Sequence, residues 1–126
     1  MWSSAMVMAN EELLISLLIN LMDNACKATE KGGQIQIGCD EGDETVTLWV
    51  QDNGRGIPKE HIPYLTEAFY REDKARSRAL GGAGLGLSLC EKIARLHKTK
   101  LQFESEKGKG TRVFFSLQKE EKTDED

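Results

Sequence analysis

The sequence has few cysteines and no long apolar run. Its three cysteines, Cys26, Cys39 and Cys90, are odd in number and show no C-x-x-C spacing. This pattern argues against a disulfide framework or a zinc site and fits a reduced, cytoplasmic setting. No apolar stretch approaches the roughly 18 residues that a membrane span needs, and the segment from Met1 to Met6 lacks the features of a signal peptide. We therefore expect a cytoplasmic protein without direct membrane contact.

Neither sign of charge dominates the 126 residues, of which 30% are charged and 39% hydrophobic, with a formal net charge of −4. This balance is typical of a soluble globular protein and argues against a general nucleic-acid surface, so no nucleic-acid partner is expected. Length and patterning predict one folded domain at residues 10–118. We expect a frayed N-terminus at 1–9 and a disordered acidic tail at 119–126.

Glycine is concentrated at 81–86, which holds four glycines in six residues. Because glycine loses the most backbone entropy on folding, we expect a loop there. Four cations lie just upstream at 71–78, so a basic loop and a glycine hinge precede a helix N-terminus, which suggests a lid over phosphates. A solvated loop before an ordinary helix start is the alternative. The apolar residues that predict this helix by their spacing are Leu85, Leu89, Ile93 and Leu96.

A longer helix is predicted from the N-cap residue Asn10 to about Thr29, ended by glycines at 32–33. Asn20, Asn24 and Lys27 share one face of it, while Asp23 points toward a more exposed side. Asparagine is a mediocre helix former, so two on one face suggest a ligand or metal contact; an ordinary boundary position is the alternative. The apolar stripe of this helix comprises Leu14, Leu17, Leu18, Leu21, Ala25 and Ala28.

Alternating apolar residues predict four strands, at 34–39, 45–51, 100–105 and 112–117. A Glu-Gly-Asp turn at 41–43 joins the first two as an antiparallel hairpin, and a short helix beginning at Pro58 follows them. The second strand runs into Asp52, which is followed by Gly54 and Gly56. A carboxylate there would accept a hydrogen bond from the exocyclic amine of a purine; a plain Asp-Asn-Gly turn is the alternative. Segregated helices and hairpins predict an α+β two-layer sandwich.

The order of these segments resembles the ATP-binding catalytic domain of bacterial sensor histidine kinases, over about 10–117. The matching segments are Asn20-Leu21-Met22-Asp23-Asn24-Ala25, Asp52-Asn53-Gly54-Arg55-Gly56-Ile57, Phe69-Tyr70-Arg71, Gly82-Ala83-Gly84-Leu85-Gly86-Leu87 and Gly108-Lys109-Gly110-Thr111, which look like the N, G1, F and G2 boxes and the terminal Gly-Thr motif of that family. The resemblance implies the Bergerat ATP-binding fold, in which three helices cover one face of a mixed sheet of about five strands.

The resemblance also implies roles for individual residues. Asn24 would bind Mg²⁺, with Asn20 and Lys27 helping to hold metal and phosphates, and Asp23 would orient the incoming imidazole. Asp52 would receive the adenine amino group. The other residues implied in ATP binding are Gly54, Gly56 and Ile57 of the base pocket, Phe69, Tyr70, Arg71, Lys74, Arg76, Gly82, Gly84, Leu85, Gly86 and Leu87 of the lid and its helix, and Thr111 near the adenine.

The implied reaction is donation of the γ-phosphoryl group of ATP to a histidine on a separate dimerisation domain, with a response regulator as indirect partner. This chain has only His61 and His97; neither lies in an acceptor motif, and His97 is expected to be a charged cap at a helix end. Related ATPases carry a glutamate where Asn20 stands, which disfavours hydrolysis here. A nucleotide-gated binding module or a related ATPase or anti-sigma-type kinase is the alternative. The isolated domain is expected to be a monomer.

Overall fold

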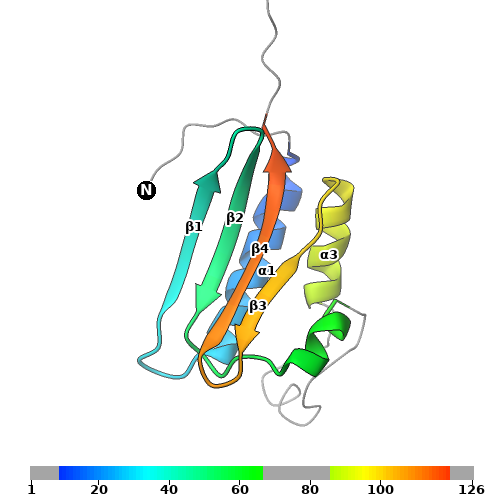
Figure 1. Cartoon of the computed structure of the whole chain (residues 1–126). Coiled ribbons are helices and arrows are strands. Elements are labelled where there is room, and N and C mark those ends of the chain that lie inside the picture. The colour runs from blue at the N-terminus through cyan, green and yellow to red at the C-terminus, as the bar shows by residue number, and fades with distance from the viewer. Residues whose placement is uncertain (1–8, 67–85, 120–126) are drawn as a thin grey trace, which may run out of the picture.

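Two β-hairpins and two long helices carry the fold in the computed structural model, which describes residues 9–66 and 86–119. The strands are β1 (Ile35–Glu41), β2 (Thr45–Asp52), β3 (Gln102–Glu106) and β4 (Gly110–Gln118), and the helices are α1 (Glu11–Ala28), the 3₁₀-helix η1 (Lys59–Tyr64) and α3 (Gly86–Leu96). The strand order is β1-β2-β4-β3. Helices α1 and α3 lie side by side behind one face of this sheet (Figure 1).

Local signals explain both ends of α1. The side chain of Asn10 accepts a hydrogen bond from the Leu13 amide at 3.0 Å, so Asn10 is the N-cap that the sequence predicts. The helix ends at Ala28, before the glycines expected to cap it. Thr29 has an extended backbone, and its hydroxyl donates to the Ala25 carbonyl at 2.6 Å. The expected glycine cap is therefore wrong: a threonine ends the helix, and Gly32 lies in the turn that follows.

Strands β2 and β4 turn alternate residues toward the helices, as the sequence pattern predicts, but β1 does not, since Ile37 is 51% exposed. Val46 and Val50 of β2 and Phe115 and Leu117 of β4 are at most 5% exposed. They meet the inward stripe of α1, and most of them join one core of Leu17, Leu21, Ala25, Val50, Cys90, Ile93, Ala94, Leu101, Phe115 and Leu117. This core binds the two layers, because its members come from α1, α3 and the strands alike.

Helix α3 buries a different stripe from the one predicted. Cys90, Ile93 and Ala94 are buried, whereas Leu89 is 44% and Leu96 67% exposed. Ile93 is thus the one predicted apolar residue of the described helix that lies in the core. The buried face is rotated because α3 packs against α1 as well as against the sheet, and the small Cys90 and Ala94 side chains allow the two helices to approach closely.

His97 links the ends of the two helices. Its Nδ1 atom lies 2.8 Å from the Ile93 carbonyl, and the Asn10 amide donates to its Nε2 atom at 2.9 Å. Since Nε2 accepts a hydrogen bond from Asn10, Nδ1 is the nitrogen that donates to the Ile93 carbonyl. As expected, His97 caps the end of α3, and through its second ring nitrogen it also joins that end to the start of α1.

The two-layer α+β class is confirmed. The described residues form four strands, where a mixed sheet of about five was expected, and each neighbouring pair in their sheet runs antiparallel. Short turns join β1 to β2 and β3 to β4, and such turns pair strands in the antiparallel direction only. The short helix expected from Pro58 is η1, with Pro58 at its N-cap. No helix among the described residues is long and apolar enough to cross a membrane.

Candidate functional site

Asp52 and Thr111 are the buried polar or charged residues of the described chain, with 9% and 7% of their surfaces exposed. They are paired residues of β2 and β4, at the end of the sheet where β2 ends and β4 begins. Burial raises the pKa of the Asp52 carboxyl, while backbone N–H groups of Gly54 and Thr111 and the charge of Arg55 oppose this rise. Burying a carboxylate costs folding free energy unless hydrogen bonds or a bound ligand compensate for it, so Asp52 is a candidate for ligand binding.

Three glycines let the chain close tightly around Asp52. A Cβ atom on Gly54 would lie 2.1 Å from the Ala28 carbonyl oxygen, and one on Gly56 would lie 2.1 Å from the Glu106 carbonyl oxygen. A Cβ atom on Gly110 would lie 2.1 Å from the carbonyl oxygen of Asp52 itself. Each of these positions therefore requires glycine on steric grounds, and Gly56 and Gly110 also have a positive φ. The loop after β2 is thereby held against both the end of α1 and the β3–β4 turn.

Ser105 joins three segments around this pocket, a role that sequence reasoning did not predict. Its hydroxyl oxygen accepts a hydrogen bond from the Ile57 amide at 2.7 Å and donates to the Gly110 carbonyl at 3.0 Å. It also lies 2.9 Å from the Thr111 hydroxyl oxygen. Gly110 and Thr111 belong to the same hairpin as Ser105, whereas Ile57 lies 48 residues away and meets Ser105 only in the tertiary fold, which a serine in an alternating strand does not signal.

Arg55 is a second residue that sequence reasoning did not assign. Its amide donates to the Ala28 carbonyl at 3.2 Å, and its guanidinium lies 3.4 Å from the Lys27 carbonyl. These carbonyls belong to the last turn of α1, where the helix dipole favours a cation. The Arg55 carbonyl in turn accepts from the Gly108 amide at 2.6 Å. Arg55 therefore links α1 to the loop that precedes Thr111.

Two asparagine side chains of α1 face the N-terminus of α3. A Cβ atom on Gly86, the first residue of α3, would lie 3.8 Å from both Asn20 Oδ1 and Asn24 Nδ2. The Asn20 amide donates from Nδ2 to the Ser16 carbonyl at 2.8 Å, which leaves its Oδ1 atom toward α3. Asn24 Nδ2 is buried and has no hydrogen-bond partner among the described residues. The structure thus brings together Asn20, Asn24 and Gly86, three of the residues that the resemblance assigns to the site.

A buried amide without a hydrogen-bond partner among the described residues is a candidate to bind a ligand. Beside it, the described part of α3 begins at Gly86, and the N–H groups and positive dipole end of a helix N-terminus suit phosphate oxygens. The Asn20 oxygen is a hard donor of the type that Mg²⁺ accepts together with phosphates and water. The residues present therefore fit both a phosphate group and a magnesium ion.

Asp23 and Lys27 form an ion pair on the outer side of α1, with Nζ and Oδ2 3.0 Å apart. The Asp23 side chain is 57% exposed, which agrees with the predicted outward direction. Lys27 is one-third exposed and lies one turn beyond Asp23 on the helix.

Leu87 packs against the core at the start of α3 rather than facing open solvent.

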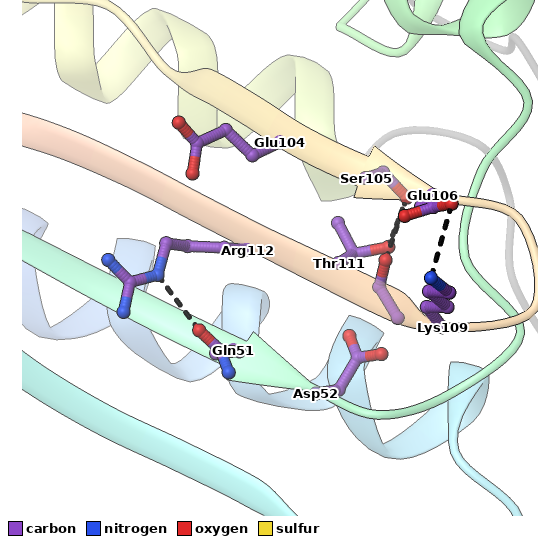
Figure 2. Close-up of a pocket in the computed structure, with 9 residues that line it drawn as sticks. Gln51, Asp52, Glu104, Ser105, Glu106, Lys109, Thr111 and Arg112 are labelled. Atoms are coloured by element: carbon purple, nitrogen blue, oxygen red, sulfur yellow. Dashed lines mark hydrogen bonds and ion pairs between the residues drawn. The ribbon is translucent and has the colours of Figure 1, made fainter.

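An open groove of about 470 Å³ runs along the strand side of this region, lined by Gln51, Asp52, Glu104, Ser105, Glu106, Lys109, Gly110, Thr111 and Arg112 (Figure 2). Gln51, Glu104 and Arg112 come from the face of the sheet opposite the helices, since they alternate with inward residues. The α1 asparagines do not line this groove. A ligand that reached both Asp52 and Asn24 would therefore lie on the helix side, and the groove borders only one end of such a site.

Part of the predicted site lies outside the described residues. This part comprises Phe69, Tyr70, Arg71, Lys74, Arg76, Gly82, Gly84 and Leu85. Their assignment to a phosphate-binding lid stays a prediction.

Comparison with known proteins gives a family and a fold. A family model described as histidine kinase-, DNA gyrase B-, and HSP90-like ATPase matches residues 9–121. Sensor histidine kinase YkoH of Bacillus subtilis (strain 168) is 47% identical over 110 residues, which make up 87% of this chain and 24% of that protein. Sensor protein SrrB of Staphylococcus aureus (strain NCTC 8325 / PS 47) is 41% identical over 105 residues, 83% of this chain and 18% of that protein.

Solved structures agree with this grouping. The nucleotide-free catalytic domain of histidine kinase ThkA matches with a TM-score of 0.76 at 31% identity, over 90% of this chain and 71% of that one. Full-length ShkA in complex with AMPPNP matches with a TM-score of 0.79 at 25% identity, over 92% of this chain and 24% of that one. The chain therefore spans less than a quarter of the length of the two sensor proteins it was compared with above.

Proposed function

Because the chain belongs to the family of histidine kinase-, DNA gyrase B- and HSP90-like ATPases, with sensor histidine kinases as relatives, we propose that it binds ATP with Mg²⁺ and donates the γ-phosphoryl group to a histidine. That histidine lies on a dimerisation domain outside this chain, and a response regulator receives the phosphoryl group in turn. This is the ATP-binding half of a two-component kinase, working in the cytoplasm.

The observation that carries this proposal is the pairing of two complementary ends of one site. At one end, buried Asp52 offers a carboxylate to the exocyclic amine of adenine. At the other end, Asn20 and Asn24 face Gly86, and Asn24 Nδ2 has no hydrogen-bond partner within 9–66 and 86–119. Gly54 connects them, because its backbone touches both the end of α1 and the Asp52 carboxylate. A nucleotide has the same two ends, an amine-bearing base and a chain of phosphates.

The chain's own residues position the phosphates rather than react with them. Asn20 and Asn24 would hold the magnesium ion, which would neutralise phosphate charge when bound. Amides at the α3 N-terminus and the Lys27 ammonium would hold the phosphate oxygens. Asp23, exposed one turn before Lys27 on the same helix, would meet the incoming imidazole and accept its proton. Such positioning and charge stabilisation account for most of catalysis in phosphoryl transfer.

Transfer is favoured over hydrolysis by Asn20. Its amide has no basicity, and its Nδ2 atom is already committed to the Ser16 carbonyl. Asn20 itself could therefore not take a proton from a water molecule beside it. An ATPase of the gyrase type, or a binding module gated by nucleotide, would need another group to replace that base.

Calorimetric titration with a non-hydrolysable ATP analogue, with and without Mg²⁺, tests the site. We expect wild type to bind and to require Mg²⁺ for full affinity. Asp52→Asn should weaken binding by about 1.5–3 kcal/mol, because a mispaired amide replaces the acceptor of the adenine amine. Asp40→Asn, on exposed residue 40 of β1, is the matched control and should bind as wild type does. Wild type that fails to bind at millimolar analogue would refute the proposal.

The transfer step needs a separate assay. The domain is mixed with γ-labelled ATP and a dimerisation domain from a related sensor kinase, and label on histidine is measured alongside released phosphate. Labelled histidine supports transfer, whereas phosphate release without labelled histidine supports the ATPase alternative.

Light scattering of the isolated domain should give a monomer, and a stable dimer would contradict that expectation.

A further inference from the structure

The hydrogen bonds around Ser105 determine which way the Thr111 hydroxyl points. Ser105 has one hydroxyl proton and two lone pairs on its oxygen. The Gly110 carbonyl has no proton to give, so the 3.0 Å contact to it must use the Ser105 proton. The Ile57 amide can only donate, so its 2.7 Å contact occupies one Ser105 lone pair. The contact between the Ser105 and Thr111 hydroxyls, 2.9 Å long, remains to be assigned.

Only one assignment satisfies all three contacts. With its proton used by Gly110, Ser105 can meet Thr111 only as an acceptor, through its second lone pair. Thr111 must then donate its own proton to Ser105 across the contact drawn in Figure 2. With its contacts to Gly110 and Ile57, Ser105 is then fully satisfied. Because its proton is donated to Ser105, the Thr111 hydroxyl oxygen can only accept hydrogen bonds from other groups.

Thr111 stands opposite Asp52 in the β2–β4 ladder, and both residues are buried. An ionised Asp52 carboxylate is also an acceptor only. This end of the pocket therefore offers two acceptors and, from these two side chains, no donor. Such a wall suits a base that presents N–H groups, as the adenine amine does, and repels a base that presents a carbonyl oxygen at the same place.

We propose that Ser105 is a positioning residue for base specificity, which acts by holding the Thr111 hydroxyl as a hydrogen-bond acceptor so that the site takes adenine and rejects guanine. This inference rests on the proposed nucleotide-binding function. Ser105 does not touch the base; it removes the one hydroxyl proton that would otherwise turn toward a guanine carbonyl. Without Ser105, the Thr111 hydroxyl is free to rotate and donate to that carbonyl.

The test compares affinities for AMPPNP and GMPPNP by calorimetry in wild type and variants. Wild type should prefer AMPPNP, and Ser105→Ala should narrow this preference by about tenfold, as expected for one mispaired hydrogen bond. Ser105→Ala also leaves the Ile57 amide unpaired, which weakens both nucleotides alike. The ratio of affinities, rather than either affinity, therefore reports on the Thr111 hydroxyl, and a merely structural role of Ser105 would leave that ratio unchanged.

The chain supplies a matched control in a second serine–threonine pair. Thr47 and Ser116 join β2 to β4 through hydroxyls 2.8 Å apart, on the sheet face opposite the helices. Ser116→Ala should leave the ratio at its wild-type value. Ser105→Thr keeps the hydroxyl and should restore the preference. Should Ser105→Ala not fold, Ser105→Cys provides the same narrowing, because a thiol is a weak donor and acceptor.

The outcomes separate the two proposals. Wild type that prefers AMPPNP while Ser105→Ala keeps the full preference would overturn the role of Ser105 and leave the ATP site intact. A ratio that narrows equally in Ser116→Ala would also overturn it, since the effect would then be general loosening of the sheet. Wild type that binds neither analogue would overturn the proposed function, and the specificity inference with it.

Discussion

Replacing Gly54 with alanine should damage both the fold and the nucleotide site through one steric contact. The added Cβ atom would lie 2.1 Å from the Ala28 carbonyl oxygen and 3.0 Å from Asp52 Oδ1. Gly54 is not among the residues with positive φ, so backbone strain adds nothing to this effect. The loop must instead move away from the end of α1, and it takes with it the 2.8 Å hydrogen bond from the Gly54 amide to Asp52.

The size of the effect follows from that displacement. Overpacking of this kind costs about 1–3 kcal/mol of unfolding free energy. A displacement of roughly 1 Å at a binding site is enough to change its activity by about a hundredfold. We therefore expect Gly54→Ala to lower the midpoint of urea denaturation and to weaken binding of the ATP analogue at least as much as it weakens the fold.

Substitutions at two other glycines distinguish a steric clash from backbone strain as the cause of the Gly54→Ala effect. Gly42 has only an ordinary contact, 3.4 Å from its Cβ position to the Thr45 carbonyl oxygen, so Gly42→Ala should be neutral. Gly32 has a φ of +91° and nothing within 4 Å, so Gly32→Ala should cost about 1–2 kcal/mol through strain alone and leave affinity unchanged. Wild-type stability and wild-type affinity in Gly54→Ala would refute the packing of this loop against α1.

Three further predictions concern other groups. Burial raises the pKa of the Cys90 thiol to about 12, so it should resist alkylation in the native domain while exposed Cys26 reacts, as mass spectrometry would detect; equal rates would contradict the packing of α3. His97→Ala should lower the unfolding free energy by about 1–3 kcal/mol, because the Asn10 amide and the end of α3 lose their partner, and hydrogen exchange at Asn10 should rise; unchanged exchange would show that the link is not formed. The folded pKa of Asp52 is raised, so the folded state holds its proton more tightly than the unfolded state does: Asp52 lowers the stability of the free domain above the folded pKa, and this cost disappears as pH falls below the unfolded value. ATP binding needs the ionised carboxylate, so on acidification the affinity should fall at a pH above the usual pKa of an aspartate. Calorimetry across pH measures this, and a loss of affinity only at the usual aspartate pKa would contradict the prediction.

The sequence predicted features that depend on neighbouring residues. The Asn10 cap, the alternation of β2 and β4 and the position of Asp52 at the end of β2 were confirmed, whereas in β1 Ile37 is 51% exposed and the alternation does not hold. Each follows from a local rule, either a cap that bonds within one turn or a period of two along a strand. The order of the glycine-rich and asparagine segments also predicted the family, which the family model confirmed.

The buried face of α3 was predicted wrongly, and the reason is physical. Leu89 and Cys90 are adjacent on one helix, yet Leu89 is exposed and Cys90 is buried. Helical spacing identifies candidate stripes but does not say which one faces α1 and the sheet. A small side chain is buried where two helices approach closely, and that distance is a property of the pair.

What only the tertiary structure decided is which distant groups meet. Ser105, Arg55 and His97 carry ordinary sequence signals, and each gains its importance from partners 5 to 87 residues away along the chain. Local propensities determine caps, strands and turns because those interactions close within a few residues. The hydrogen bond from the Ile57 amide to Ser105 and the contacts that hold the loop of Gly54 against α1 form only once segments far apart in the sequence have packed around one core.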